Sequence, residues 1–300
     1  MRLWEGLRLA IGTLSVFPVR VERVDREVAG HAMVLAPAVG LALGLVAGLP
    51  LFLPGPPLLG AALAVGLLAV LTRGLHLDGL ADLADGLGSG KPAAQALAIM
   101  KKSDIGPFGV MTLVLTLVIQ VVAVAYAGFA AFVMACVAGR LALTWACRAG
   151  VPAARADGLG AMVAGTVRRP AAWLVTLLAL LGAAVLGLGV LPDHEPTTWA
   201  PASAVPGDST GTERFDTWLD DSDAPVSVEP LVDVAVPPPP SVPFTYGVIV
   251  LPLGLLTGMG AALLLLRHAR RRLGGITGDV LGALVEAATA TALVVCVILG

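Results

Sequence analysis

The 300-residue sequence contains little charge, few aromatic residues and little cysteine. Charged residues make up 13% of the chain and aromatic residues 5%, whereas hydrophobic residues make up 57%. An ordinary soluble domain holds roughly 45–50% apolar residues, and a water-soluble fold of this length could not bury the excess. The composition therefore excludes the soluble class, in agreement with a mean hydropathy of +0.89.

The three cysteines offer no thiol metal centre. Cys136, Cys147 and Cys296 lie in apolar segments and lack the spacing of metal ligands. We expect all three to be buried as small hydrophobic residues.

Long apolar runs predict membrane-spanning helices. About 20 apolar residues cross a hydrocarbon core about 30 Å thick, and inside lipid each span must be a helix that pairs its own backbone groups. The opening segment alternates Trp4, Leu7 and Ile11 with charged residues, which is typical of a helix lying at the membrane interface. The sequence thus predicts an all-α, polytopic bundle with an interfacial N-terminal helix and about seven transmembrane helices, at residues 33–53, 58–72, 108–127, 129–146, 171–191, 246–266 and 280–299.

The basic residues predict the orientation of these spans, because Lys and Arg stay on the cytoplasmic side of short loops. A cytoplasmic N-terminus leaves only Arg214 outside and only Arg140 within a span. The first 30 residues lack the apolar core and cleavage site of a signal peptide. We therefore expect a cytoplasmic N-terminus and, after seven spans, a C-terminus on the opposite side.

Residues 192–245 differ from the rest of the chain in being rich in Pro, Ser, Thr and acids. Such a segment cannot offset the entropy of ordering, so we expect a disordered, non-cytoplasmic loop between two membrane parts, residues 1–191 and 246–300. The net charge of −2 is consistent with a basic cytoplasmic face, because this loop holds many of the acids. Such a face suits anionic lipid or a phosphorylated substrate, and no nucleic-acid partner is expected.

Ionisable groups are concentrated in the segment RGLHLDGLADLADGLGSG, residues 73–90. Asp78, Asp82 and Asp85 are spaced i, i+4, i+7 and fall within about 60° of one another on a helix. Like charges this close favour a cation among them. Oxygen-only ligands indicate Mg²⁺ or Mn²⁺. The alternative is a solvated polar face of a cytoplasmic loop.

Other residues near this stripe add to the candidate site. Gly79 and Gly86 interleave with the acids and permit close approach of the backbone to a ligand. His76 is a candidate base or phosphate donor, or a structural residue of the interface.

Three further patches are predicted on the same side of the membrane. Lys101 and Ser103 precede a span, where the lysine either clamps a phosphate or anchors the helix by the positive-inside rule. Arg140 within a span is a functional-site hypothesis, because a charge there faces the bundle interior or a cavity. Gly275 and Asp279 open the last span, with Asp279 as a further carboxylate, an N-cap, or both.

Five segments together resemble the cobalamin synthase, or adenosylcobinamide-GDP ribazoletransferase, family. They are GLHLDGLADLADGL, IMKKSDIGPFG, AGR at residues 138–140, RADGLG at 155–160 and LGGITGDVLGA at 273–283. The resemblance covers residues 1–191 and 246–300. It implies a Mg²⁺-dependent enzyme of the bacterial inner membrane with a cytoplasmic active site, whose substrates are adenosylcobinamide-GDP and α-ribazole or α-ribazole 5′-phosphate. It further implies a reaction in which the ribose hydroxyl attacks the cobinamide-linked phosphate and GMP leaves.

Combined with this resemblance, the residues give a set of predicted roles. The predicted catalytic residues are His76, Lys101 and Arg140. The predicted substrate-binding residues are Gly79, Gly86, Lys101, Ser103, Arg140, Gly275 and Asp279. The predicted metal ligands are Asp78, Asp82 and Asp85.

One motif departs from the family pattern, and two other functions stay open. Family members usually have IMKDSRIG where this chain has IMKKSDIG, so an acid is absent at Lys102 and present at Asp104.

The alternative functions are a Mg²⁺-dependent phosphotransferase of the CDP-alcohol type and a transporter. The oligomeric state is left open by the sequence.

Overall fold

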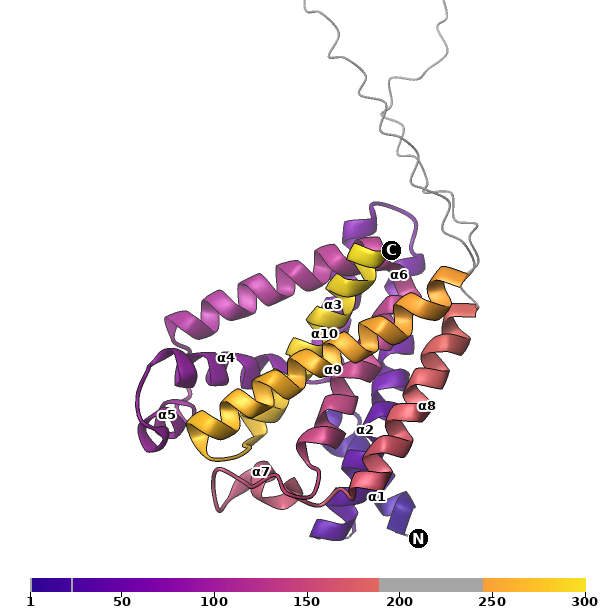
Figure 1. The fold of residues 1–300 in the computed structure, drawn as a ribbon. Helices are drawn as coiled ribbons and strands as arrows, with labels where there is room; N and C mark the ends of the chain where they lie inside the picture. Colours follow the sequence, from indigo (N-terminus) through magenta and orange to yellow (C-terminus); the bar gives the residue numbers. More distant parts are fainter. Residues whose placement is uncertain (1, 23, 189–244) are drawn as a thin grey trace, which may run out of the picture. The chain divides into compact units, whose positions relative to one another are not determined.

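A computed structural model describes residues 2–22, 24–188 and 245–300 (Figure 1). These residues form helices, and no strand occurs among them apart from isolated bridges such as Arg148 to Val167. The predicted loop 192–245 lies outside the described residues except for Thr245, which begins a helix. The elements are α1 Arg2–Leu14, α2 Arg26–Ala47, the 3₁₀ helix η1 Leu49–Phe52, α3 Pro57–Leu71, α4 Leu75–Gly88, α5 Ala93–Ile99, α6 Pro107–Ala146, α7 Gly158–Val163, α8 Arg169–Leu188, α9 Thr245–Leu273 and α10 Gly278–Leu299.

The all-α multi-pass prediction is confirmed. Within the described residues, five helices are long and apolar enough to cross a membrane: α2 with η1, α6, α8, α9 and α10. A sixth span results if α3 and α4, which are bent by 88°, are counted as one. The outer face of α8 shows why such helices need lipid, because four leucines at helical spacing are each more than half exposed: Leu174, Leu177, Leu178 and Leu181.

The count differs from the predicted seven mainly at α6. This element has 40 residues and covers two predicted spans; it would be about 60 Å long if straight, twice the hydrocarbon thickness. Gly128 has a φ of 74° and breaks the helical backbone. Figure 1 shows the two arms of α6 running in different directions on either side of this break. Counting the arms separately restores both predicted spans.

Helix α10 occupies the centre of the bundle and packs against α4, α6 and α9, while α2 packs against α6 and α1. Close approach depends on small residues, as is typical of membrane helices. A Cβ at Gly40 of α2 would lie 2.6 Å from the Cys136 carbonyl of α6, and one at Gly258 of α9 would lie 2.5 Å from the Ala288 carbonyl of α10. The predicted burial of the three cysteines is confirmed.

The N-terminal helix forms as predicted, with Leu9, Ala10 and Leu14 on its buried face and Trp4 exposed. Arg8 lies over the Trp4 ring, 5.2 Å from its centroid. The exposed Trp4 ring beside a cation suits a position at the membrane interface.

Candidate active site

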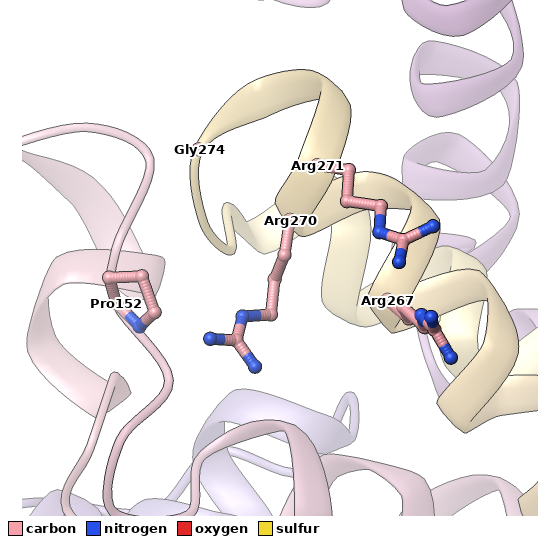
Figure 2. Close-up of a pocket in the computed structure, with 5 residues that line it drawn as sticks. All are labelled: Pro152, Arg267, Arg270, Arg271 and Gly274. Carbon is pink, nitrogen blue, oxygen red and sulfur yellow. The ribbon is translucent and has the colours of Figure 1, made fainter.

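Two pockets of about 310 Å³ each lie in the described part of the chain. One is lined mainly by arginines of α9 (Figure 2). The other, called here the carboxylate pocket, has a wall from α4 and a wall from the segment before α6; its lining residues are Asp82, Asp85, Ser89, Ile99, Lys102, Asp104, Gly106, Pro107 and Phe108. Two residues of the predicted aspartate stripe, Asp82 and Asp85, therefore line a pocket of ligand size, and Asp78 is not part of its lining.

A sharp turn after α3 directs α4 toward the start of α10. Arg73 and Gly74 adopt left-handed backbone conformations, with φ of 55° and 65°, and α4 leaves at 88° to α3. Gly79 then lies against the backbone of Asp279, because a Cβ at Gly79 would be 2.8 Å from the Asp279 carbonyl oxygen. The crossing of α4 over α10 brings the aspartate stripe beside Asp279.

The carboxylates at this crossing share one electrostatic environment. Asp82 belongs to none of the five single-helix spans. Its pKa is raised to about 6, and burial is the largest cause. Three neighbouring carboxylates raise this pKa in the same direction, in decreasing order Asp78, Asp279 and Asp85. Arg155 opposes the shift. Such a concentration of negative charge strongly favours the binding of a cation.

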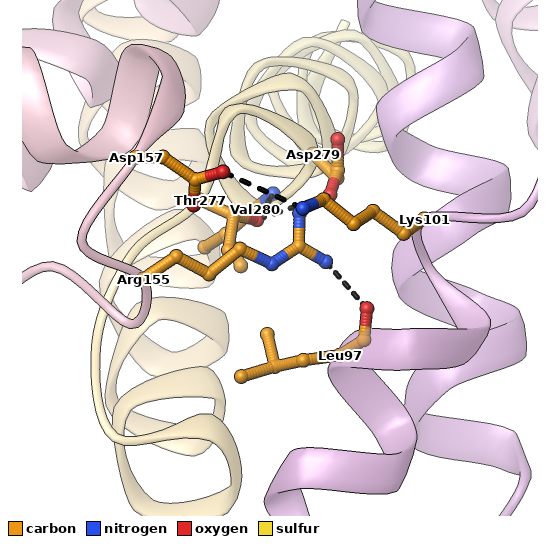
Figure 3. Close-up of polar contacts among 7 residues, drawn as sticks. All are labelled: Leu97, Lys101, Arg155, Asp157, Thr277, Asp279 and Val280. Atoms are coloured by element: carbon orange, nitrogen blue, oxygen red, sulfur yellow. Dashed lines mark hydrogen bonds and ion pairs between the residues drawn. The ribbon is translucent and has the colours of Figure 1, made fainter.

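Arg155 joins three segments around Asp279 (Figure 3). Its guanidinium lies 3.8 Å from Asp279 Oδ2 and donates a hydrogen bond of 2.5 Å to the Leu97 carbonyl at the end of α5. Asp279 also accepts a 3.2 Å hydrogen bond from the Thr277 hydroxyl, which caps α10 by accepting from the Val280 amide. The predicted N-cap role of Asp279 is therefore wrong, because Thr277 caps α10, and Asp279 supplies a carboxylate beside the cap. Sequence reasoning did not select Arg155, although its RADGLG segment was part of the family resemblance.

Asp85 has a structural partner on α6. Its two oxygens accept hydrogen bonds from the Gly106 amide, at 2.7 Å, and from the Gly109 amide, at 2.9 Å. These amides belong to the first turn of α6, where unpaired N–H groups and the helix dipole favour an anion. Asp85 thus anchors the start of α6 as well as lining the pocket. Its role as a metal ligand remains a prediction.

The other predicted surface residues lie around this centre. Lys101 forms an exposed ion pair of 3.4 Å with Asp157 (Figure 3), and Ser103 is exposed. Lys102 and Asp104 both line the carboxylate pocket, so the departure from the family motif occurs inside the candidate site.

His76 and Arg140 lie in the bundle core instead of the carboxylate pocket. They are 3% and 1% exposed, and Arg140 Nε and His76 Nδ1 have no hydrogen-bond partner among the described residues. The titratable neighbours of Arg140 include His76 and Glu286, and Glu286 accepts a 2.7 Å hydrogen bond from Gln120. Arg155, rather than Arg140, is the arginine beside the carboxylates. Gln120 and Glu286 were not predicted, although polar residues inside apolar spans signal such a cluster.

The three glycines predicted to bind substrate are at close packing contacts. A Cβ at Gly275 would lie 2.5 Å from the Pro152 carbonyl, and the next residue, Ile276, donates a backbone hydrogen bond to Pro152 and accepts one from Ala154 of the same loop. Gly79 faces backbone on α10, whereas Gly86 faces the flexible side chain of Met100, 2.6 Å from its Cγ. Substrate binding by these glycines remains a prediction.

This difference gives a matched pair of substitutions. Gly79→Ala is expected to destabilise the protein by about 1–3 kcal/mol and to lower turnover, because the Asp279 backbone cannot yield without moving α10. Gly86→Ala is expected to have a smaller effect, because Met100 can change rotamer. Thermal unfolding in detergent and initial rates measure both effects. Equal losses in the two variants would show that the α4–α10 contact does not set the site.

The aspartates at the crossing of α4 and α10 offer oxygen ligands for a metal ion. Among the described ranges, no three His, Cys, Asp or Glu side chains form a cluster that could hold a metal. Asp78 and Asp82 nevertheless supply neighbouring carboxylate oxygens whose charges repel. Mg²⁺ is usually bound through one or two carboxylates together with substrate phosphates and waters. These two carboxylates therefore fit the protein's share of a Mg²⁺ site, and the remaining ligands would have to come from outside the described residues.

The fold and the site define a polytopic membrane protein whose helix α4 carries aspartates beside two neighbouring features, the carboxylate pocket against the start of α6 and the crossing with the first turn of α10. Comparison with known proteins is more specific. The family model described as cobalamin-5-phosphate synthase matches residues 6–207 and 225–297, and the chain belongs to this family.

Relatives named adenosylcobinamide-GDP ribazoletransferase occur in several organisms. The protein of Frankia casuarinae is 38% identical over 96% of this chain and 92% of its own length. That of Nocardioides sp. is 44% identical over 62% of this chain and 83% of its own, and that of Corynebacterium efficiens is 30% identical over 99% and 92%. No solved structure matches the chain significantly.

Proposed function

We propose that this chain is a transferase that joins adenosylcobinamide-GDP to α-ribazole or α-ribazole 5′-phosphate and releases GMP, at the last stage of cobalamin synthesis. The observation that carries the proposal is the family match over most of the chain. It removes the two alternatives that the sequence left open, the CDP-alcohol phosphotransferase and the transporter. The crossing of α4 and α10, which brings Asp78, Asp82 and Asp279 together, is the candidate active site.

The reaction exchanges one phosphorus–oxygen bond for another. The ribose hydroxyl of the acceptor forms a bond to the cobinamide-linked phosphorus, the bond from that phosphorus to the GMP phosphate breaks, and the hydroxyl proton is released. Phosphoryl transfer asks the protein mainly for positioning and charge neutralisation. Cationic side chains at this site, Arg155 and Lys102, would offset phosphate charge.

The proposed function includes a requirement for Mg²⁺. Asp78 and Asp82 would hold the ion, which when bound supplies neutralisation of phosphate charge during transfer. Arg155 keeps Asp279 oriented at the edge of this site through its contact of 3.8 Å. Asp85 holds the first turn of α6 and so shapes the opposite wall of the pocket.

We further propose that the N-terminus and the carboxylate pocket face the cytoplasm of a bacterial inner membrane. Support comes from the basic loops, which are joined to one another at a single end of the bundle. Arg155 donates to the Leu97 carbonyl, Arg270 to the Gly150 carbonyl and Arg272 to the Lys91 carbonyl. Basic loops gather on the cytoplasmic side.

A reconstituted assay tests the function. The purified protein in liposomes is incubated with adenosylcobinamide-GDP, α-ribazole or its 5′-phosphate, and Mg²⁺, and the products are separated by chromatography. We expect equal amounts of GMP and a cobalamin product. Release of GMP without a cobalamin product would mean hydrolysis, and the transferase proposal would then be wrong.

Charge exchange between Lys102 and Asp104 tests the departure from the family motif. Lys102→Asp alone is expected to lower kcat/KM by about tenfold, because a further acid joins Asp82 and Asp85 in the pocket. Adding Asp104→Lys keeps the net charge of the pocket and should recover part of the loss. A double-mutant cycle measures the coupling. Strictly additive effects would place both residues outside the functional site.

A further inference from the structure

The pocket at the C-terminal end of α9 is distinct in chemistry from the carboxylate pocket. Its lining residues are Pro152, Arg267, Arg270, Arg271 and Gly274, and its volume is about 310 Å³. In Figure 2 Arg270 points toward the loop that holds Pro152, while Arg267 and Arg271 lie together on the helix end. We call this the arginine pocket. Its three arginines are spaced i, i+3, i+4 and therefore share one helix face.

Within the part of the chain that the structure describes, no carboxylate neutralises the positive charge of this pocket. Among the described residues, none of the three arginines forms an ion pair with Asp or Glu. Arg270 instead donates a hydrogen bond of 3.3 Å to the Gly150 carbonyl. Further like charge lies nearby, since burial first, and then Arg270 and Arg169, lower the pKa of Arg148. An anion in the pocket would relieve this repulsion.

The shape and chemistry of the pocket suit a phosphate group. Guanidinium groups present planar pairs of donors that match phosphate oxygens. Cations at a helix C-terminus can also serve as simple membrane anchors, but anchoring requires no cavity. Here the turn at Gly274, with a φ of 86°, and the facing loop at Pro152 border an open pocket beside the guanidiniums.

The arginine pocket is also connected to the candidate active site. Gly274 lies five residues before Asp279, so their Cα atoms are at most about 18 Å apart. The intervening backbone is held by two hydrogen bonds, from Ala154 to the Ile276 carbonyl at 2.9 Å and from Ile276 to the Pro152 carbonyl at 3.0 Å. A ligand phosphate in the arginine pocket would therefore be presented at a fixed position relative to the carboxylates.

We infer that the arginine pocket binds a phosphate group. Two sources carry this chemistry at the proposed face of the membrane: the 5′-phosphate of the acceptor, and the head group of an anionic lipid. The inference rests on the proposed function only for the first source. We expect the acceptor phosphate, because the pocket adjoins the loop that leads to Asp279.

A binding measurement tests the inference without relying on activity. Melting temperatures in detergent are compared in inorganic phosphate and in chloride at matched ionic strength, because a ligand of the folded state raises the melting temperature. The wild type is expected to be stabilised by phosphate. The double variant Arg267→Gln/Arg270→Gln should lose this response, while the control Arg20→Gln, at an exposed arginine in another loop, should keep it. An equal response in all three proteins would overturn the inference.

Kinetics then identify the source. In neutral phosphatidylcholine liposomes, the double variant should lose about 10- to 100-fold in kcat/KM for α-ribazole 5′-phosphate and little for α-ribazole. Loss for both acceptors that appears only when phosphatidylglycerol is included would assign the site to a lipid phosphate. Equal loss for both acceptors in every lipid mixture would indicate a structural role and overturn the inference. A wild type inactive with both acceptors would contradict the proposed function, and the melting measurement would still decide the binding site.

Discussion

Replacing Asp82 with Asn is expected to lower kcat/KM by about 10²- to 10³-fold, because contacts that neutralise charge in the transition state are worth several kcal/mol. Asn keeps the size of the side chain and removes its charge. Asp78→Asn should act in the same direction, because Asp78 is the carboxylate with the strongest influence on Asp82. Initial rates at several donor concentrations give kcat/KM. The matched control is Glu22→Gln, an exposed acid outside the pocket.

The stability of these variants separates function from folding. Asp82 and its three neighbouring carboxylates repel one another, so removing one charge should leave the melting temperature unchanged or slightly raised. Low activity together with a preserved melting temperature is the expected result. Normal turnover in both Asp82→Asn and Asp78→Asn would show that the aspartate stripe of α4 is not part of the catalytic site.

Asp85→Asn is expected to destabilise the protein by about 2–4 kcal/mol, because hydrogen bonds to a charged acceptor are worth about 1.5–3 kcal/mol each. The carboxylate accepts from both the Gly106 and Gly109 amides, and Asn offers one acceptor oxygen for two donors. The first turn of α6 should loosen. The midpoint of unfolding in detergent and protease cleavage near residue 106 would report the change.

Asp82→Asn is the matched comparison for this prediction. It removes the same charge from the same helix, and among the described residues Asp82, unlike Asp85, accepts no hydrogen bond from α6. If Asp85→Asn kept the wild-type stability but lost activity as Asp82→Asn does, Asp85 would be a metal or substrate ligand rather than the anchor of α6.

The composition and the apolar runs were sufficient to predict the membrane class, because crossing lipid imposes length and hydropathy on each helix. The division of residues 107–146 near Gly128 was also predictable, since one straight span could not accommodate that length. The short α3 was less predictable. Its bent partner α4 carries the aspartates, and whether the two form one span depends on packing rather than on local sequence.

The aspartate stripe was predictable from spacing alone, but its partners were not. Helical periodicity placed Asp85 with Asp78 and Asp82, whereas the start of α6, more than 20 residues later, supplies its two donors. Arg155 reaches Asp279 across a loop of irregular backbone, for which periodicity gives no signal. Local patterns indicate which residues share a helix face, and the contacts between helices decide what that face meets.

Arg140 and His76 show the opposite limitation. A charge inside a span correctly indicated a polar interior, but the sequence could not tell whether that interior adjoined the aspartates. The structure gives Arg140 a buried neighbour, Glu286, that lies 146 residues later in the chain. Gly79 was interpreted as a ligand contact, and the structure explains it by the close crossing of α4 and α10.

The most direct test of the central proposal is the metal dependence of the reconstituted enzyme. Wild-type protein in liposomes is stripped with EDTA, and cobalamin formation is then followed as Mg²⁺ is added back, in parallel with Asp82→Asn. Activity should vanish in EDTA and return with Mg²⁺ in the wild type, while Asp82→Asn should need a much higher Mg²⁺ concentration or fail to recover. Full turnover of the wild type in EDTA, or an identical Mg²⁺ response in Asp82→Asn, would contradict the assignment of the carboxylate pocket as a magnesium-dependent active site.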